Sequence, residues 1–295
     1  MLSLSECIPW MTVGLAESVA IVILNLCAII VFIRNRNLRK RSTYLVINLA
    51  VTDMLAGGIY AYQMFYLPGK SCNLWMQLSI EDGTFYFLLF SVLFNFGSLT
   101  NITIIALERV HATFYPFKHR VLKKWVYGLT IAVVWVTSGL VTIVSELLRQ
   151  IEETSYYGLY LLTTYVSICL MVTCASYTSI VIKVRCGAQP QHHGAASRER
   201  KLTMTLLIVT VVSLLLCLPY VIWSYVSKLE IWYSLSISVA YHLDNALLFL
   251  LLANSLINPI LYTIRIPEYR SALLALFRKR PQQQRQVADF PLRDM

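Results

Sequence analysis

Long apolar stretches alternate with short polar segments along almost the whole chain, and the charged residues are gathered in the short segments. Each stretch is about 20 residues or longer, which is the length that a helix needs to cross the hydrocarbon core of a bilayer. Seven helices this apolar could not share one soluble core in a chain of 295 residues. We therefore predict seven membrane-spanning helices, at residues 11–33, 43–67, 83–107, 125–146, 157–182, 202–227 and 233–264.

The composition agrees with a membrane protein. Hydrophobic residues make up 57% of the chain and charged residues only 14%, whereas a soluble domain has about 25% charged residues. The net charge of +10 would suit a nucleic-acid partner, but the basic residues lie in clusters between the apolar stretches. We therefore predict that the spans contact membrane lipids and that the chain binds no nucleic acid.

Lysine and arginine lie almost entirely on one side of the predicted membrane. The segments after the first, third, fifth and seventh spans hold all 25 of these residues except Lys70, Arg149 and Lys228. By the positive-inside rule these segments face the cytoplasm, so the N-terminus is predicted to be extracellular and the C-terminus cytoplasmic. The first span is longer than the apolar core of a signal peptide, roughly 7–15 residues, and is expected to act as the insertion signal itself.

Four parts follow from this pattern. Residues 1–10 form a short extracellular N-terminus, and residues 11–264 form the seven-transmembrane domain. Residues 265–280 mix apolar and basic residues, which is typical of a helix that lies in the membrane interface, and Pro267 suits its first turn. Residues 281–295 are polar and are predicted to be a disordered cytoplasmic tail. The predicted fold class is an all-α membrane bundle of seven transmembrane helices with a short amphipathic eighth helix.

Polar residues and prolines recur at membrane depth, where polar groups are costly and by default functional. They stand at characteristic places on successive spans. These residues are Asn25, Asn48-Leu49-Ala50-Val51-Thr52-Asp53, Glu108-Arg109-Val110, Trp135, Tyr177, Pro219 and Asn254-Ser255 with Asn258-Pro259 and Tyr262. In this order they resemble the rhodopsin-like (class A) G-protein-coupled receptors, and the resemblance covers nearly the whole chain.

The resemblance implies a plasma-membrane receptor that transmits an extracellular ligand signal to heterotrimeric G proteins. The alternative is a seven-helix scaffold or scavenger that does not signal. A channel or transporter ranks third. Many transporters are built from duplicated halves, and these spans show no internal repeat. No H-E-x-x-H or G-x-S-x-G motif occurs, so we do not expect an enzyme.

Asp53 is an acid in the middle of a predicted span. One interpretation is a carboxylate that neighbouring hydroxyls and amides satisfy. The resemblance favours another, a sodium ion, since a hard cation takes several oxygen ligands. The sodium ligands that the resemblance implies are Asp53, Ser98, Asn254, Ser255 and Asn258.

The inner ends of the spans carry the residues expected to contact the G protein. The resemblance implies that Arg109 is held at rest in an ionic lock and released when the sixth helix moves, although a plain arginine could also reach to lipid headgroups. Pro219 and Pro259 are expected to act as hinges, since proline kinks a helix. The coupling and lock residues that it implies are Glu108, Arg109, Phe117, Tyr177, Glu199 and Tyr262.

Departures from the family pattern narrow the resemblance. Thr84 replaces the outer cysteine of the third helix, Cys169 replaces the proline of the fifth, and Cys217 replaces the tryptophan of the sixth. These departures, with the stretch around Asp53, place the chain nearest to the melanocortin, lysophospholipid, cannabinoid and adenosine receptors, with a melanocortin-like pattern. Asn258 counts against a true melanocortin receptor, which carries aspartate there. Loss of these restraints makes constitutive signalling an expectation.

The ligand class is narrowed only in part. Ser91 stands where amine receptors carry aspartate, and Leu252 stands where opsins carry the retinal lysine, so neither an amine nor retinal is expected. A small lipid and a peptide both remain open, and apart from sodium no cofactor is predicted. Cys7 and Cys72 fall in extracellular segments, where disulfides persist, so they form either a bond or two free thiols. The predicted ligand-pocket residues are Gln63, Glu81, Asp82, Ser91, Asn95, Tyr220, Ser224 and Asp244.

Overall fold

The computed structural model describes residues 3–38, 41–71, 81–151, 155–186, 208, 211–213, 215–223, 226 and 236–277. Helix is the only regular secondary structure in these residues. The helices are α1 (Leu4–Arg34), the 3-10 helix η1 (Arg36–Leu38), α2 (Thr43–Ser71), α3 (Glu81–Phe114), α4 (Pro116–Val121), α5 (Lys124–Gln150), α6 (Ser155–Cys186), α8 (Ile237–Arg265) and α9 (Pro267–Phe277).

Six helices are long and apolar enough to cross a membrane, namely α1, α2, α3, α5, α6 and α8. They coincide with six of the seven predicted spans. A shorter apolar helix, Val211–Trp223, falls within the predicted sixth span. The order and placement of the spans therefore follow the hydropathy pattern, because a helix is how an apolar segment satisfies its own backbone hydrogen bonds in lipid.

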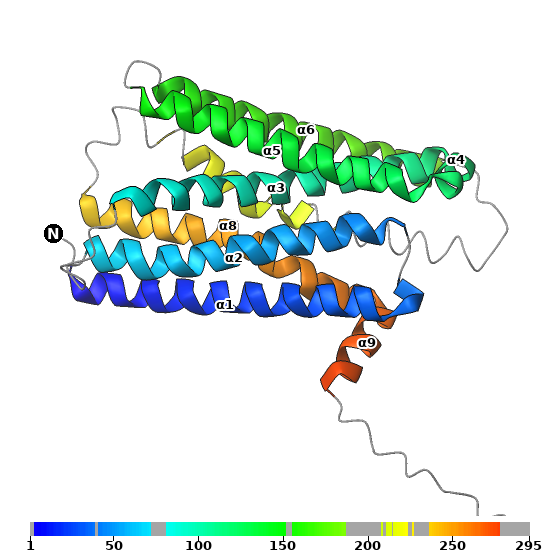
Figure 1. The fold of residues 1–295 in the computed structure, drawn as a ribbon, viewed down its shortest axis with the longest axis horizontal. Coiled ribbons are helices and arrows are strands. Elements are labelled where there is room, and N and C mark those ends of the chain that lie inside the picture. The colour runs from blue at the N-terminus through cyan, green and yellow to red at the C-terminus, as the bar shows by residue number, and fades with distance from the viewer. Residues whose placement is uncertain are drawn as a thin grey trace, which may run out of the picture.

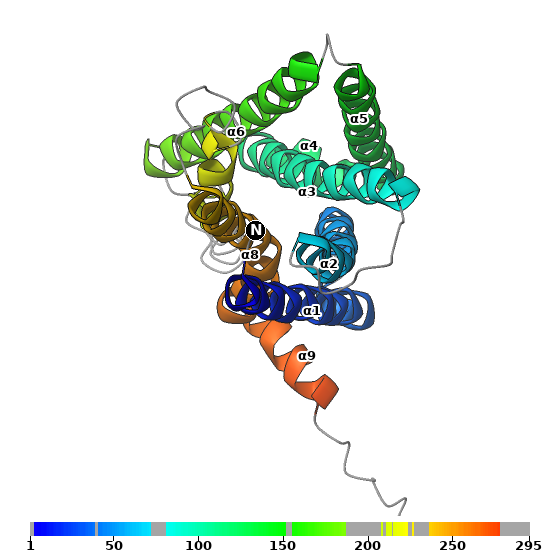
Figure 2. The ribbon, with the colours of Figure 1, turned by 90° about the vertical axis from the view of Figure 1, so that its left-hand side faces the viewer.

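The long helices lie roughly side by side along one axis, and α9 leaves the bundle at its far end (Figure 1). The central helix is α3, which contacts α2, α5 and α6, while α8 contacts α1 and α2. Seen along the bundle axis, α1, α2 and α8 form one side and α5 and α6 the other (Figure 2). Residues on α2, α3 and α8 can therefore meet in the middle of the bundle.

Helix α1 begins earlier than the predicted span. Ser3 and Glu6 form a capping box, in which the Ser3 backbone N–H donates to Glu6 Oε2 at 2.7 Å. This local hydrogen bond starts the helix at Leu4, so most of the predicted N-terminal segment, residues 1–10, is helical. Hydropathy does not reveal such a start, because a capping box is built from polar residues.

Close contact between α1 and α2 depends on small residues. A Cβ atom added to Gly57 would lie 2.8 Å from Ile21 Cγ2, so only glycine allows the two helices to approach this closely. Small residues have this role in membrane proteins because lipid provides no hydrophobic force between helices, and packing must hold them together. The contact also brings Ile21 into a buried cluster with Ala56, Tyr60 and Leu252.

Helix α9 is attached to the bundle by aromatic rings. Tyr269 is buried and packs 5.2 Å from Phe32 of α1 and 6.0 Å from Tyr262 of α8, measured between ring centroids. Burial raises the pKa of the Tyr269 phenol well above its ordinary value. Leu274 and Phe277 remain exposed on the outer face, as expected for a helix that lies in the membrane interface.

Candidate functional site

Asp53 lies at the centre of the bundle, where α2, α3 and α8 meet, and its side chain is 0% exposed. Its Oδ1 accepts hydrogen bonds from Ser98 Oγ at 2.6 Å and from Ser255 Oγ at 2.8 Å. Its Oδ2 accepts a hydrogen bond from Asn258 Nδ2 at 2.8 Å. The structure thus brings four of the five predicted sodium ligands into direct contact, and it satisfies the carboxylate with three donors.

Two amide oxygens among the predicted sodium ligands lack hydrogen-bond donors. Asn254 Oδ1 and Asn258 Oδ1 are buried and have no hydrogen-bond partner within the part of the chain that the structure describes. Carboxylate, hydroxyl and amide oxygens together are the ligands that a hard monovalent or divalent cation prefers. The described residues contain no group of three histidine, cysteine or acidic side chains that could bind a softer metal. The oxygen ligands present at this site therefore fit a sodium ion.

A second polar cluster lies closer to α5, and sequence reasoning missed its central residue, Asn101. Asn48 Nδ2 donates to Asn101 Oδ1 at 2.7 Å, and Trp135 Nε1 donates to Asn48 Oδ1 at 3.1 Å. Asn101 is fully buried and also donates to Gly97 O. An amide at membrane depth was the signal that could have revealed it. The cluster links α2, α3 and α5 near the Asp53 site.

Glu108 lies at the end of α3 and contacts side chains of two other elements. Glu108 Oε2 is 2.6 Å from Arg109 Nε, and Glu108 Oε1 is 2.7 Å from His119 Nε2 on α4. Tyr127 of α5 donates a longer hydrogen bond of 3.5 Å to the same Oε1 and lies 3.2 Å from His119. His119 and Tyr127 were not predicted from the sequence. The other predicted lock residue, Glu199, lies outside the described residues.

Helix α4 displays Phe117, whose residue surface is 81% exposed. Pro116 starts the helix, as proline does at a first helical position. At the other end of α4, Arg41 Nη1 donates to the carbonyls of Arg120, at 3.2 Å, and Leu122. Arg41 and His119 therefore fix α4 from two sides, and the predicted coupling residue Phe117 points away from the bundle.

The two predicted coupling tyrosines lie in different clusters. Tyr177 is buried among apolar residues of α2, α3, α5 and α6. Tyr262 packs against α1 and α9, with its ring 5.7 Å from that of Phe32. If either tyrosine contacts a G protein, its ring must therefore leave its present packing. Pro259 lies inside α8, and Pro219 lies within the helix Val211–Trp223. Their action as hinges stays a prediction.

Three of the predicted ligand-pocket residues, Ser91, Asn95 and Asp244, lie in two hydrogen-bonded groups. Asn95 Nδ2 donates to Tyr60 Oη at 2.6 Å and to Ser91 O at 2.8 Å. On the other side, Trp223 Nε1 donates to Asp244 Oδ1 at 2.6 Å, which joins the sixth span to α8.

The other five predicted pocket residues stay predictions. Gln63 and Tyr220 are half-buried. Ser224 and the side chains of Glu81 and Asp82 lie outside the described residues. The structure therefore brings Ser91 and Asn95 together, and sequence reasoning missed the partners Tyr60 and Trp223.

Cys7 is disulfide-bonded, so of the two alternatives that the sequence left open for it, the structure has the bond. Cys72, the candidate partner named from the sequence, lies outside the described residues. Nearby, Trp10 Nε1 donates to His242 Nδ1 at 2.8 Å, and Ser238 Oγ donates to Glu6 Oε1. These contacts hold the first turns of α1 against α8.

Residues 24–262 match the family described as "7 transmembrane receptor (rhodopsin family)". The chain belongs to the rhodopsin family. The receptor is 28% identical to the histamine H2 receptor of Canis lupus familiaris, over 84% of its own length and 73% of that protein. It is 28% identical to the human lysophosphatidic acid receptor 2, over 87% and 76% of the two chains, and 27% identical to the mouse substance-K receptor, over 91% and 75%.

The crystal structure of squid rhodopsin superposes with a TM-score of 0.77 and 16% identity, and covers 94% of this receptor and 87% of that chain. This match confirms the predicted seven-helix bundle. The family consists of multi-pass plasma-membrane receptors that signal through G proteins, so the receptor is a signalling protein and not an enzyme. The finer resemblance to melanocortin receptors stays a prediction.

Proposed function

We propose that the receptor couples to its G protein through the end of α3, where Glu108 holds two elements at once. Glu108 pairs with Arg109 on its own helix and with His119 on α4. Through His119 it also holds the helix that presents Phe117. The two contacts of Glu108 are the observation that carries this proposal. Through them one acid links Arg109 to α4, the helix that presents Phe117 to a partner.

Activation is a shift between two helix arrangements that the ligand favours unequally. When Arg109 leaves Glu108, the inner end of the bundle opens and accepts a helix of the G protein. Pro219 and Pro259 allow the movement, since each interrupts a helical hydrogen-bond ladder. In this state Tyr177 and Tyr262 turn toward Arg109.

A sodium ion at Asp53 would stabilise the resting arrangement. The ion would be held by the Asp53 carboxylate, the hydroxyls of Ser98 and Ser255, and the amide oxygens of Asn254 and Asn258. Its positive charge offsets the cost of a buried carboxylate. The unpaired amide oxygens support this proposal, because they otherwise remain buried without a donor.

For the ligand we propose a small lipid or a peptide that enters from the extracellular side. Ser91 has no charge to pair with an amine, and Leu252, in an apolar cluster, has no amino group to bind retinal. The relatives named above include receptors for lysophosphatidic acid and substance K. The polar group of Tyr60, Ser91 and Asn95 is the proposed contact in the pocket.

The proposed orientation places the N-terminus and the Trp10–His242 contact outside the cell, and α4 and α9 inside. The distribution of lysine and arginine supports it. An epitope after residue 295 should be reached by antibody only after permeabilisation, whereas an epitope before residue 1 should be reached on intact cells. A tail epitope reached on intact cells would overturn the orientation.

The decisive experiment measures nucleotide exchange on purified G proteins with the receptor in nanodiscs. We expect exchange by the wild-type receptor, basal or driven by ligands from lipid and peptide libraries, and its loss in Arg109→Ala. Arg34→Ala is the matched control, because it also removes an arginine at the same end of the bundle, but an exposed one in the last turn of α1. Absence of exchange with every G-protein family would favour the non-signalling scaffold.

A further inference from the structure

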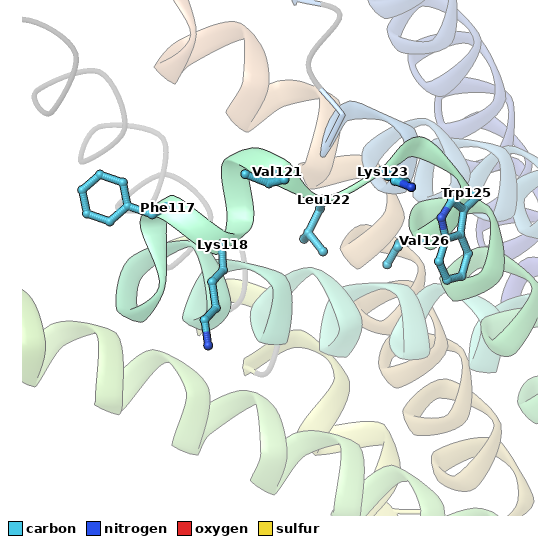
Figure 3. Close-up of a pocket in the computed structure, with 7 residues that line it drawn as sticks. All are labelled: Phe117, Lys118, Val121, Leu122, Lys123, Trp125 and Val126. Atoms are coloured by element: carbon cyan, nitrogen blue, oxygen red, sulfur yellow. The ribbon is translucent and has the colours of Figure 1, made fainter.

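A groove runs along α4 and the start of α5, with a cavity volume of about 620 Å³. Phe117 lies at one end and Trp125 at the other, and Val121 and Leu122 lie between them (Figure 3). The volume falls in the range of small-molecule sites, roughly 300–1,000 Å³. The walls are mainly apolar, so the groove suits a ligand with a hydrocarbon part.

Two lysines contribute the charge of this groove. Lys118 and Lys123 both line it, and no acidic residue does. Both are exposed, and neither forms an ion pair with any described residue. Arg120 and Lys124 add further positive charge on the same short segment. The ligand that complements this groove therefore carries a negative charge beside its apolar part.

The groove continues into the lipid-facing surface of α5. Trp125 is 64% exposed, and exposed apolar side chains follow it at helical spacing, at Leu129, Val133, Val136 and Leu140. Residues three or four apart lie on one face of a helix, so these side chains form a continuous apolar stripe. Tryptophan is enriched at the level of lipid headgroups, which places the lysines at the membrane surface and the stripe in its core.

We propose that the groove binds an anionic phospholipid. The headgroup lies between Lys118 and Lys123, and an acyl chain follows Trp125 down the α5 stripe. Clusters of basic residues beside a span attract anionic lipids, by about 1 kcal/mol for each lysine or arginine. The assignment of this lipid to the cytoplasmic leaflet rests on the proposed orientation, whereas the site itself does not.

Quenching of Trp125 fluorescence tests the proposal directly. The receptor is placed in nanodiscs that contain phosphatidylserine or phosphatidylcholine with brominated acyl chains, which quench nearby indoles. The difference between wild type and Trp125→Phe isolates the signal of Trp125 from those of the other tryptophans. We expect Trp125 to be half-quenched at a mole fraction of brominated phosphatidylserine roughly 25-fold lower than for brominated phosphatidylcholine, since two lysines each contribute about 1 kcal/mol.

Removal of the lysines should abolish this preference while Trp125 stays in contact with lipid. The preference should fall about five-fold for each lysine replaced in Lys118→Gln and Lys123→Gln, and phosphatidylcholine should still quench. The matched control is Arg34→Gln with Arg36→Gln, which removes two charges at the same end of the bundle but beside α1. This control should leave the preference unchanged.

Several outcomes would overturn the site. Equal quenching by the two lipids, or an equal loss of preference in the arginine control, would reduce it to general attraction between charges. Displacement of brominated phosphatidylserine by millimolar inorganic phosphate would identify a soluble anion as the ligand. Displacement by purified G protein, with no headgroup preference in its absence, would assign the groove to the protein partner alone. None of these readouts uses nucleotide exchange, so the lipid site and the signalling proposal fail separately.

Discussion

The side chain of Asn25 donates a 3.0 Å hydrogen bond to the backbone carbonyl of Ser255. In a regular helix that carbonyl would accept from the N–H of the residue four positions later, which is Pro259 and has no N–H. Asn25 of α1 therefore supplies the hydrogen bond that the proline in α8 cannot make. The same residue pair joins the first helix to the Asp53 site, because Ser255 Oγ donates to Asp53.

Asn25→Leu should destabilise the receptor, because it leaves the Ser255 carbonyl without a donor in the bundle core. Buried hydrogen bonds between membrane helices contribute about 0.6–2 kcal/mol. The expected loss should shrink in the Pro259→Ala background, where the substituted alanine restores the backbone donor. Thermal unfolding in detergent of the two single variants and the double variant measures this coupling. Equal losses in both backgrounds would refute the compensation.

Sodium should raise the thermal stability of the wild-type receptor relative to an equal concentration of choline chloride. A ligand present at ten times its dissociation constant stabilises the folded state by about 1.4 kcal/mol. Asp53→Asn should remove the sodium-dependent shift, because it removes the only charged ligand. Asn101→Ala is the control, since Asn101 is buried nearby but bonds to Asn48 instead of Asp53. A full sodium response in Asp53→Asn would exclude the site.

Contacts between residues on spanning helices could be predicted from the sequence. Contacts that depend on how the connecting segments fold could not. Asp53 and Ser98 meet because each occupies a set place on a spanning helix, and the order of spans fixes which helices are neighbours. His119 lies on α4 and Arg41 bonds to its end, and the place of α4 beside α3 depends on the path of two connecting segments. A lone histidine or arginine in a basic segment carries no pattern that predicts such a contact.

His119 should act as a positioning residue for coupling. His119→Phe removes the hydrogen bond to Glu108 and loosens α4, so a higher G-protein concentration should be needed for half-maximal exchange while the maximal rate is retained. His119→Gln keeps a polar group that can reach Glu108 and should restore much of the apparent affinity. A fall in maximal rate alone, or no difference between the phenylalanine and glutamine variants, would contradict this role.

Glu17 of α1 should be a site where substitution stabilises the receptor. Its side chain is buried, at 6% exposure, and neither carboxylate oxygen has a hydrogen-bond partner in the described part of the chain. Burying a polar group without a partner costs about 1–3 kcal/mol in proteins, and leucine of similar size would avoid this cost. Glu17→Leu should therefore raise the melting temperature in detergent.

Glu146→Leu is the matched comparison for Glu17→Leu, because Glu146 is equally buried but accepts two hydrogen bonds from Arg149, at 2.9 Å from Nε and 2.7 Å from Nη2. Glu146→Leu removes two hydrogen bonds between charged groups, so this variant should lower the melting temperature. Opposite signs in the two variants would show that the partner, and not burial alone, decides whether an acid inside the bundle stabilises it. A fall in both would show that Glu17 makes a favourable interaction in the folded receptor.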